Sequence, residues 1–236
     1  MTLVFQEDAY AAHCTAKVTS IDEGIIRLDR TVFYPTGGGQ PGDTGRLLWE
    51  GGEIPITDTR KGESLTDVLH IAAEGSEPPP AGTHVQAEID WARRYALMRM
   101  HTTLHLLCSL VPGDVTGGQI GAAKSRLDFN ITGDQIDKDE LSRSLNALVE
   151  ADRPVRTHWI DAAELAERPD MVRTMSVKPP IDGGRVRLIE IAEVDLQPCG
   201  GTHVARTSEI GPLRIGKVES KGKQNRRINV HLATGD

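Results

Sequence analysis

The sequence predicts an α+β protein with two domains: a small N-terminal β-barrel over residues 1–90 and an α+β two-layer sandwich over residues 91–236. The chain has 236 residues, more than a typical single domain. Residues 14–90 contain short strand-like stretches separated by Gly, Pro and Asp, whereas a long helical pattern begins just after Asp90. This change of pattern predicts the domain boundary.

Six short stretches build the predicted barrel. Each has strand-like composition and is bounded by turn-forming residues. The stretches are residues 15–21, 24–29, 46–50, 53–58, 67–72 and 84–89. Short strands at this spacing predict a small closed sheet.

A glycine-rich segment, FYPTGGGQPGDTG, occupies residues 33–45 within the predicted barrel. Glycine allows positive φ and a close approach of the backbone to a ligand. The segment lacks the Gly-Lys-Ser/Thr of a Walker loop and the spacing of a dinucleotide fingerprint. From the residues alone, a simple turn between strands and a ligand-approaching loop are equally good interpretations.

The second domain is predicted to begin with a helix over residues 91–110, for which Asp90 is a good N-cap and Val-Pro-Gly a good stop. Further helices are predicted over residues 138–150 and 162–167. Strands are predicted over residues 116–121, 124–131, 155–160, 186–191, 213–220 and 226–232. We expect the helix over 91–110 to pack on a sheet of these strands.

Two pairs of residues have metal-ligand chemistry: His101 with His105, and Cys199 with His203. Each pair has i, i+4 spacing, which places two side chains on one helix face or across one tight turn. Three imidazoles and a thiolate suit zinc. The alternative is a pair of core histidines on the apolar stripe of the helix. Because two buried imidazoles one turn apart are hard to satisfy without an ion, we predict one zinc site built from both segments.

The coordination of this predicted site stays open. Four protein ligands make a closed, structural zinc site, whereas three ligands leave a position for catalysis. The helix lacks the glutamate of the H-E-x-x-H metalloproteases, and the two pairs lie too far apart in sequence for a zinc finger.

The overall charge excludes nucleic-acid binding by bulk attraction, because the net charge is −7 and aromatic residues make up only 4%. Positive charge is local: residues 214–227 carry six basic residues and one glutamate, and Arg93, Arg94 and Arg99 lie on the predicted histidine helix. This basic stretch is either a solvated strand face or a track for a phosphate backbone.

Three cysteines in a long chain make no disulfide framework, and a metal-binding Cys199 must be reduced. We therefore expect a cytoplasmic protein. No apolar run reaches transmembrane length, so no membrane partner is expected.

Several motifs in order resemble the alanyl-tRNA editing domain. They are HTTLHLL, GGQIGAAKSRLDFN, DLQPCGGTHVARTSEIG and SKGKQNRRINV. FYPTGGGQPGDTG ahead of DWARRYALMRMH is similar to the first half of the free-standing AlaX proteins of medium length. The resemblance implies that His101, His105, Cys199 and His203 bind zinc. It also implies an aminoacyl-tRNA deacylase that hydrolyses the ester of tRNA(Ala) mischarged with serine or glycine, acting in trans for translational fidelity.

The resemblance also implies substrate-binding residues. Gln119 matches a glutamine of the amino-acid pocket, and Arg126 and Asp128 fall where the family has Arg-Phe-Asp-Phe, with Leu127 in place of the first Phe. Thr31 is expected to recognise the serine hydroxyl. The glycines expected to approach the substrate are Gly37, Gly38 and Gly39, and the residues expected to bind tRNA are Lys217, Lys221, Lys223, Arg226 and Arg227. The alternative function is a non-catalytic tRNA-binding module with a structural zinc.

Overall fold

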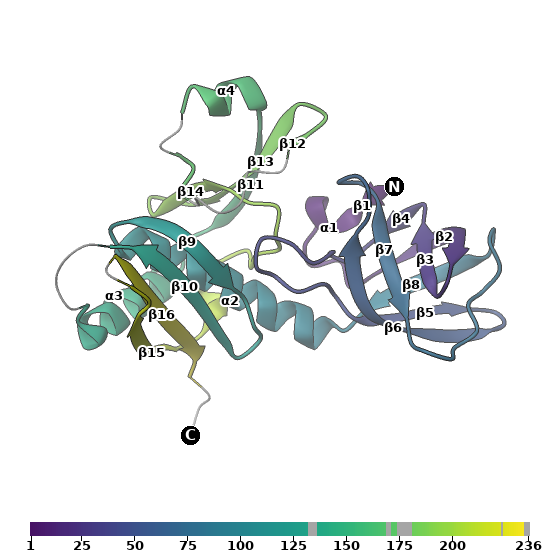
Figure 1. Ribbon diagram of the computed structural model, residues 1–236, viewed down its shortest axis with the longest axis horizontal. Helices are drawn as coiled ribbons and strands as arrows, with labels where there is room; N and C mark the ends of the chain where they lie inside the picture. Colours follow the sequence, from purple (N-terminus) through teal and green to yellow (C-terminus); the bar gives the residue numbers. More distant parts are fainter. Residues whose placement is uncertain (132–135, 169–170, 174–180, 223, 234–236) are drawn as a thin grey trace. The chain divides into compact units, whose positions relative to one another are not determined.

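The structure is a computed structural model that describes residues 1–131, 136–168, 171–173, 181–222 and 224–233. The chain forms two compact units, Met1–Tyr95 and Ala96–Asp236. Figure 1 labels their helices and strands.

The first unit is a closed, six-stranded barrel, as the sequence predicted. Its strands follow the order β2-β3-β7-β6-β5-β8, and every neighbouring pair is antiparallel. They are β2 (His13–Asp22), β3 (Ile25–Leu28), β5 (Gly45–Trp49), β6 (Gly52–Lys61), β7 (Val68–Ala72) and β8 (His84–Ile89). All six coincide with stretches predicted from the sequence.

Alternating side chains fill the barrel, as expected for a small closed sheet. Ala16 and Val18 of β2 and Ile54 and Ile56 of β6 are buried, while the residues between them are at least partly exposed. The two-residue turn between β2 and β3 has positive φ at both positions, 46° at Glu23 and 82° at Gly24. Such a turn matches the twist of a hairpin.

Three short elements of the first unit were not predicted: β1 (Thr2–Leu3), α1 (Val4–Glu7) and β4 (Arg30–Thr31). β1 pairs with β4 in parallel. Elements of two to four residues are too short to show a periodic pattern, so the sequence gives no signal for them.

Helix α2 (Trp91–Leu110) has the predicted bounds, and Asp90 caps it by accepting a hydrogen bond from the Arg93 amide. The division between the two units falls within this helix, after Tyr95, whereas we expected it before the helix, after Asp90. The difference arises because the first turn of α2 packs with the barrel. Trp91 packs against the barrel core, and Arg94 is fully buried among barrel residues.

The second unit is mixed α and β and contains two four-stranded sheets. The first has the order β15-β16-β10-β9 and consists of β9 (Asp114–Gln119), β10 (Lys124–Asn130), β15 (Leu213–Ser220) and β16 (Asn225–Leu232). Helices α2 and α3 (Lys138–Glu150) lie behind this sheet in Figure 1. Asn146 of α3 ties the layers together, because its side chain bonds both the amide and the carbonyl of Leu213.

We expected one sheet packed by a helix, and the second sheet is an addition. It comprises β11 (Val155–Asp161), β12 (Ile181–Asp182), β13 (Arg185–Ile191) and β14 (Asp195–Pro198), all of which pair through β13. The short helix α4 (Ala162–Ala166) and the 3-10 helix η2 (Thr207–Ile210) complete the described elements of this unit. Cys199 directly follows the last residue of β14, so this strand positions one of the predicted metal ligands.

None of the helices in the described part of the chain combines the length and apolar character that a bilayer crossing requires.

Candidate metal centre

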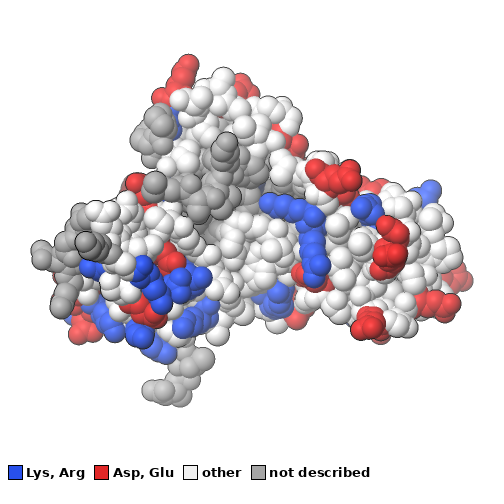
Figure 2. Space-filling view, in the orientation of Figure 1, with Lys and Arg blue, Asp and Glu red and all other residues white. Residues whose placement is uncertain are grey.

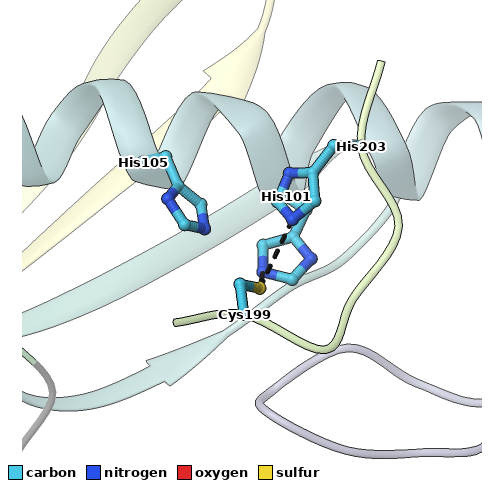
Figure 3. Close-up of side chains that lie close together, drawn as sticks. All are labelled: His101, His105, Cys199 and His203. Carbon is cyan, nitrogen blue, oxygen red and sulfur yellow. Dashed lines mark hydrogen bonds between the residues drawn. The ribbon is translucent and has the colours of Figure 1, made fainter. Parts of the chain in front are cut away.

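The structure brings the two predicted ligand pairs together within the second unit (Figure 3). His101 and His105 project from one face of α2, while Cys199 and His203 come from the loop that follows β14. One potential ligand atom from each residue lies within 4.8 Å of all the others. The Cys199 Sγ is 3.5 Å from His101 Nε2 and 3.3 Å from His203 Nε2.

A buried arginine shapes the loop that carries Cys199 and His203. The Arg187 guanidinium donates to the carbonyls of Cys199, at 2.9 Å, and Gly201, at 2.8 Å. The Cys199 amide in turn donates to the Arg187 carbonyl, which continues the pairing of β14 with β13. The loop is therefore attached to β13 through the Cys199 amide and through the carbonyls of Cys199 and Gly201.

His105 is oriented by a carboxylate that the sequence interpretation missed. Its Nδ1 lies 2.7 Å from Asp195 Oδ2, and the other Asp195 oxygen accepts a 2.7 Å hydrogen bond from Gln197. The Asp195 side chain is only 5% exposed. Metal-binding imidazoles usually donate their second ring N–H to a carboxylate or carbonyl, so an Asp four residues before Cys199 was a usable signal.

His203 is oriented by Thr102, which lies between the two histidines of α2. The Thr102 hydroxyl donates its one hydrogen to the Met98 carbonyl, so it can only accept from His203 Nδ1, 3.2 Å away. It also accepts from the Val204 amide. His203 and His105 therefore carry a hydrogen on Nδ1, which leaves Nε2 of each ring to act as a ligand.

The electrostatics of the cluster favour a thiolate at Cys199 and a neutral imidazole at His203. Burial alone would raise the pKa of the Cys199 thiol, but His101 and His203 hold that pKa well below its usual value. Burial, with His101 nearby, holds the pKa of His203 well below its usual value. Burial opposes protonation of His105 too, yet its hydrogen bond to Asp195 raises its pKa to about 10. A thiolate and a neutral imidazole are the forms that bind metals, so Cys199 and His203 are in that form, whereas His105 must release a proton when it binds an ion.

The donor set fits a metal ion. Tetrahedral bonds of about 2.0–2.3 Å place ligand atoms roughly 3.3–3.8 Å apart, and the closest observed separations fall in this range. One sulfur and three imidazole nitrogens are soft to borderline ligands. The cluster could therefore hold a divalent ion of that preference.

Thr31 lies inside the first unit with its hydroxyl engaged. The Thr31 Oγ1 is 2.8 Å from His70 Nε2 and accepts a hydrogen bond from the Phe33 amide. Burial lowers the pKa of His70 to about 4, so the ring is neutral near pH 7. Because His70 Nδ1 donates to the Ile26 carbonyl, its Nε2 must accept from Thr31. Thr31 is fully buried, and its role in serine recognition stays a prediction.

The predicted glycines form a tight turn. Gly37 and Gln40 exchange two backbone hydrogen bonds of 3.0 Å, and Gly38 and Gly39 between them have positive φ of 58° and 82°. The Tyr34 hydroxyl donates to the Gly37 carbonyl. The interpretation as a turn is confirmed, while an approach to substrate stays a prediction.

Gln119 and the basic residues lie on the first sheet of the second unit. Gln119 is exposed at the end of β9, and its oxygen accepts from Arg126 at 3.3 Å. Figure 2 shows Lys and Arg gathered over β10, β16 and β15. Of the predicted tRNA-binding residues, Lys217 and Lys221 are exposed, Arg226 and Arg227 are partly buried on β16, and Lys223 lies outside the described residues.

Arg94 does not provide the positive charge that we expected beside the histidines, whereas Arg99 keeps its charge. Arg94 is buried against Asp43 and the Val32 carbonyl, and Arg99 donates to the Ile210 carbonyl. That expectation was wrong for Arg94, because its side chain is fully buried.

Comparison with known proteins points to tRNA enzymes. Residues 186–229 match the family described as threonyl and alanyl tRNA synthetase second additional domain, and residues 6–93 match class II (A) tRNA synthetases. The chain is 37% identical over 233 residues to the alanyl-tRNA editing protein AlaX-M of Methanosarcina barkeri and 34% identical over 231 residues to that of Methanosarcina acetivorans. Each alignment covers 94% of both chains. It is also 35% identical over 231 residues to the alanine–tRNA ligase of Pyrobaculum arsenaticum, covering 92% of this chain but 25% of the ligase.

Proposed function

Because the chain belongs to the AlaX family of alanyl-tRNA editing proteins, we propose that it hydrolyses the aminoacyl ester of tRNA(Ala) mischarged with serine or glycine, with zinc as its metal. The observation that carries this proposal is the convergence of His101, His105, Cys199 and His203, in a chain that matches such proteins along nearly their whole length. The protein acts in trans, after the synthetase has charged the tRNA. The reduced thiol that the centre needs supports a cytoplasmic location.

Side chains next to the four candidate ligands hold those ligands in position. A bound zinc ion polarises a carbonyl or lowers the pKa of a water molecule to about 7. Asp195 and Thr102 hold His105 and His203 with Nε2 directed to the cluster. Arg187 fixes the loop that carries the thiol.

Discrimination must depend on polar contacts, because alanine is smaller than serine and cannot be rejected by size. A site that hydrogen-bonds the serine hydroxyl disfavours alanine, since its buried polar groups would be left unpaired. Gln119 is the proposed partner whose amide is exposed. Thr31 is the second proposed partner, although its hydrogen is directed to His70 in this structure.

The direct test is a paired deacylation assay. Ser-tRNA(Ala) and Ala-tRNA(Ala) are incubated with the protein, with and without a zinc chelator. We expect rapid loss of the seryl ester, retention of the alanyl ester, and loss of activity with the chelator. Equal hydrolysis of both esters would remove the proposed specificity, and full activity in metal-free protein would exclude the zinc.

A cysteine substitution tests the metal centre by a second route. Cys199→Ala should abolish both bound zinc, measured by elemental analysis, and seryl ester hydrolysis. Cys14→Ala is the matched control, because Cys14 is a half-buried free thiol in β2 and no member of the cluster. If Cys199→Ala retains wild-type hydrolysis, the cluster is not the catalytic centre.

The second candidate function is a tRNA-binding module with a structural zinc. The observation in its favour is that all four protein ligands converge, which is typical of closed sites. Binding of Ser-tRNA(Ala) without turnover would support this module. The names of the relatives favour editing.

A further inference from the structure

The first sheet of the second unit has one buried and one open face. In β10, Ser125, Leu127 and Phe129 are buried. Helices α2 and α3 lie on one side of this sheet (Figure 1), and a sheet face covered by helices is its buried face. Side chains alternate along a strand, so Lys124 and Arg126 project from the opposite, open face. Residues paired directly across neighbouring strands share a face, so this assignment extends along the sheet.

Three basic residues form a row across the open face. Lys124 of β10 is paired in register with His231 of β16, and His231 is paired with Arg214 of β15. Neighbouring strands lie about 5 Å apart, so the row spans roughly 10 Å. Gly216 leaves room for the imidazole, because a Cβ at this position would lie 2.6 Å from His231 Nε2.

Three other basic groups near this row, Arg126, Arg227 and Lys221, have carboxylate partners, whereas the exposed Lys217 of β15 has none among the described residues. Arg227 makes two hydrogen bonds to Asp128, at 2.7 and 2.8 Å, and Arg126 makes a third at 2.9 Å. Lys221 lies 2.7 Å from Glu219. Arg126, Arg227 and Lys221 therefore share two carboxylates, which compensate part of their charge within the protein.

The cations of the row, in contrast, have no carboxylate partner in the part of the chain that the structure describes. Among the described residues, no carboxylate forms an ion pair with Lys124 or Arg214. Burial lowers the pKa of His231, and Arg214 and Lys124 on either side lower it further. Like charges directly opposite one another are unfavourable in a sheet, and an anion placed over the row would relieve that repulsion.

We propose that the row Lys124–His231–Arg214 binds the phosphate backbone of the tRNA substrate. This inference rests on the proposed function, and it names Lys124, Arg214 and His231, rather than the paired Arg227, as the primary phosphate contacts of the sheet. Charge complementarity carries it: the chain has a net charge of −7, so a polyanion must bind where positive charge is both local and uncompensated.

The test measures the affinity of the metal-loaded full chain for uncharged tRNA(Ala) over a series of salt concentrations. Lys124→Ala/Arg214→Ala should weaken binding by roughly 10-fold or more near 0.1 M salt and lower the slope of log K against log salt by about 2. The matched control is Lys138→Ala/Arg143→Ala, which removes the same charges from exposed positions of α3, on the other side of the sheet. The control should keep the wild-type slope. Equal effects of the two variants, or an unchanged slope in the first, would overturn the proposal.

A pH series tests His231 separately. The charged groups near His231 on this sheet are Lys124, Arg126 and Asp128 on β10, Arg227 on β16, and Arg214, Lys217 and Glu219 on β15, with Lys221 just after it. A bound phosphate favours the charged imidazole, so the affinity of the wild-type chain should rise as pH falls from 7.5 to about 6. His231→Gln should show a smaller rise. An identical pH profile in the two proteins would remove His231 from the contact.

Deacylation kinetics separate this proposal from the proposed function. With Ser-tRNA(Ala), the Lys124→Ala/Arg214→Ala variant should show a raised KM and an unchanged kcat. A chain that binds tRNA through the row but hydrolyses no ester would overturn the proposed function and leave the row standing. If the variant hydrolyses the ester with a wild-type KM, the proposed row is overturned and the proposed function stands.

Discussion

Asp195 illustrates how one side chain can control the metal centre without binding the metal. Its carboxylate accepts the Nδ1 hydrogen of His105 and is held on its other oxygen by Gln197. Asp195→Asn keeps the shape of the side chain and removes its charge. We expect metal affinity to fall by roughly 10- to 100-fold, because such partners orient the imidazole and raise its basicity. Competition with a chromogenic chelator measures the affinity.

Asp114→Asn is the control for this substitution, since Asp114 is an exposed carboxylate at the start of β9 in the same unit. It should bind the metal as the wild-type chain does. If Asp195→Asn also retains wild-type affinity, the hydrogen bond to His105 contributes only to packing.

His70 makes the stability of the barrel dependent on pH. Burial lowers its pKa from 6.5 to about 4, so the unfolded chain binds a proton between these values while the folded chain does not. Stability should therefore fall as pH decreases from 7, by about 2 kcal/mol at pH 5 from this group. His70→Gln should be less stable at pH 7 but lose less stability between pH 7 and 5. Urea unfolding at the two pH values measures this, and equal losses would assign the effect to other groups.

At the scale of elements, sequence periodicity was sufficient for the long helices and the barrel strands. The bounds of α2 and α3 follow from the caps Asp90 and Asp137 and from apolar residues at helical spacing. β12 and β14, with two and four residues, offer too few positions for a period. The two long strands of the second sheet, β11 and β13, were predicted, but strand periodicity does not show which strands pair, so their separation from the first sheet was missed.

The candidate site shows a similar division between local and long-range information. The i, i+4 spacing of His101 with His105 and of Cys199 with His203 was visible in the sequence, and their types indicated that both pairs bind one ion. The burial of Arg94 was not visible, since nothing local in the sequence shows that Asp43, 51 residues away, forms its partner. Long-range pairing of polar groups depends on the fold rather than on spacing.

The cap of α3 provides a prediction for a single element. Asp137 accepts hydrogen bonds from the amides of Asp139 and Glu140, at 2.9 and 3.0 Å, and these bonds lower its pKa. A lowered carboxyl pKa stabilises the fold above the ordinary Asp value, and the contribution is lost as pH falls through the lowered pKa. Asp137→Ala should therefore be less stable than wild type at pH 7, with a difference that shrinks near pH 3.

Asp137→Asn is the informative control for the cap, because asparagine keeps the acceptor but does not titrate. It should remain closer to wild type than Asp137→Ala at pH 7. Chemical unfolding at both pH values compares the three proteins. A pH-independent deficit in Asp137→Ala would show that the charge of Asp137 plays no part.

At the scale of the whole molecule, the boundary between the two units depends on whether Arg94 belongs to the first unit or to the second. Its guanidinium is completely buried and binds Asp43, together with the carbonyls of Val32 and Ala9, all within the first unit. Asp43 itself is 1% exposed and accepts from the Tyr34 amide. A barrel that ended at residue 90 would keep this buried carboxylate without its cation.

Three fragments test this boundary: residues 1–90, residues 1–95, and residues 1–95 with Arg94→Met. We expect the second to unfold cooperatively in urea. The other two should be less stable by about 3–5 kcal/mol, since removing one partner of a buried ion pair leaves an uncompensated charge. Arg60→Ala in the 1–95 fragment is the control; the Arg60 pair with Asp58 is largely exposed, so its loss should change stability by less than about 1 kcal/mol. If the fragments ending at 90 and 95 are equally stable, the barrel ends before α2, and the first turn of that helix belongs to the second unit.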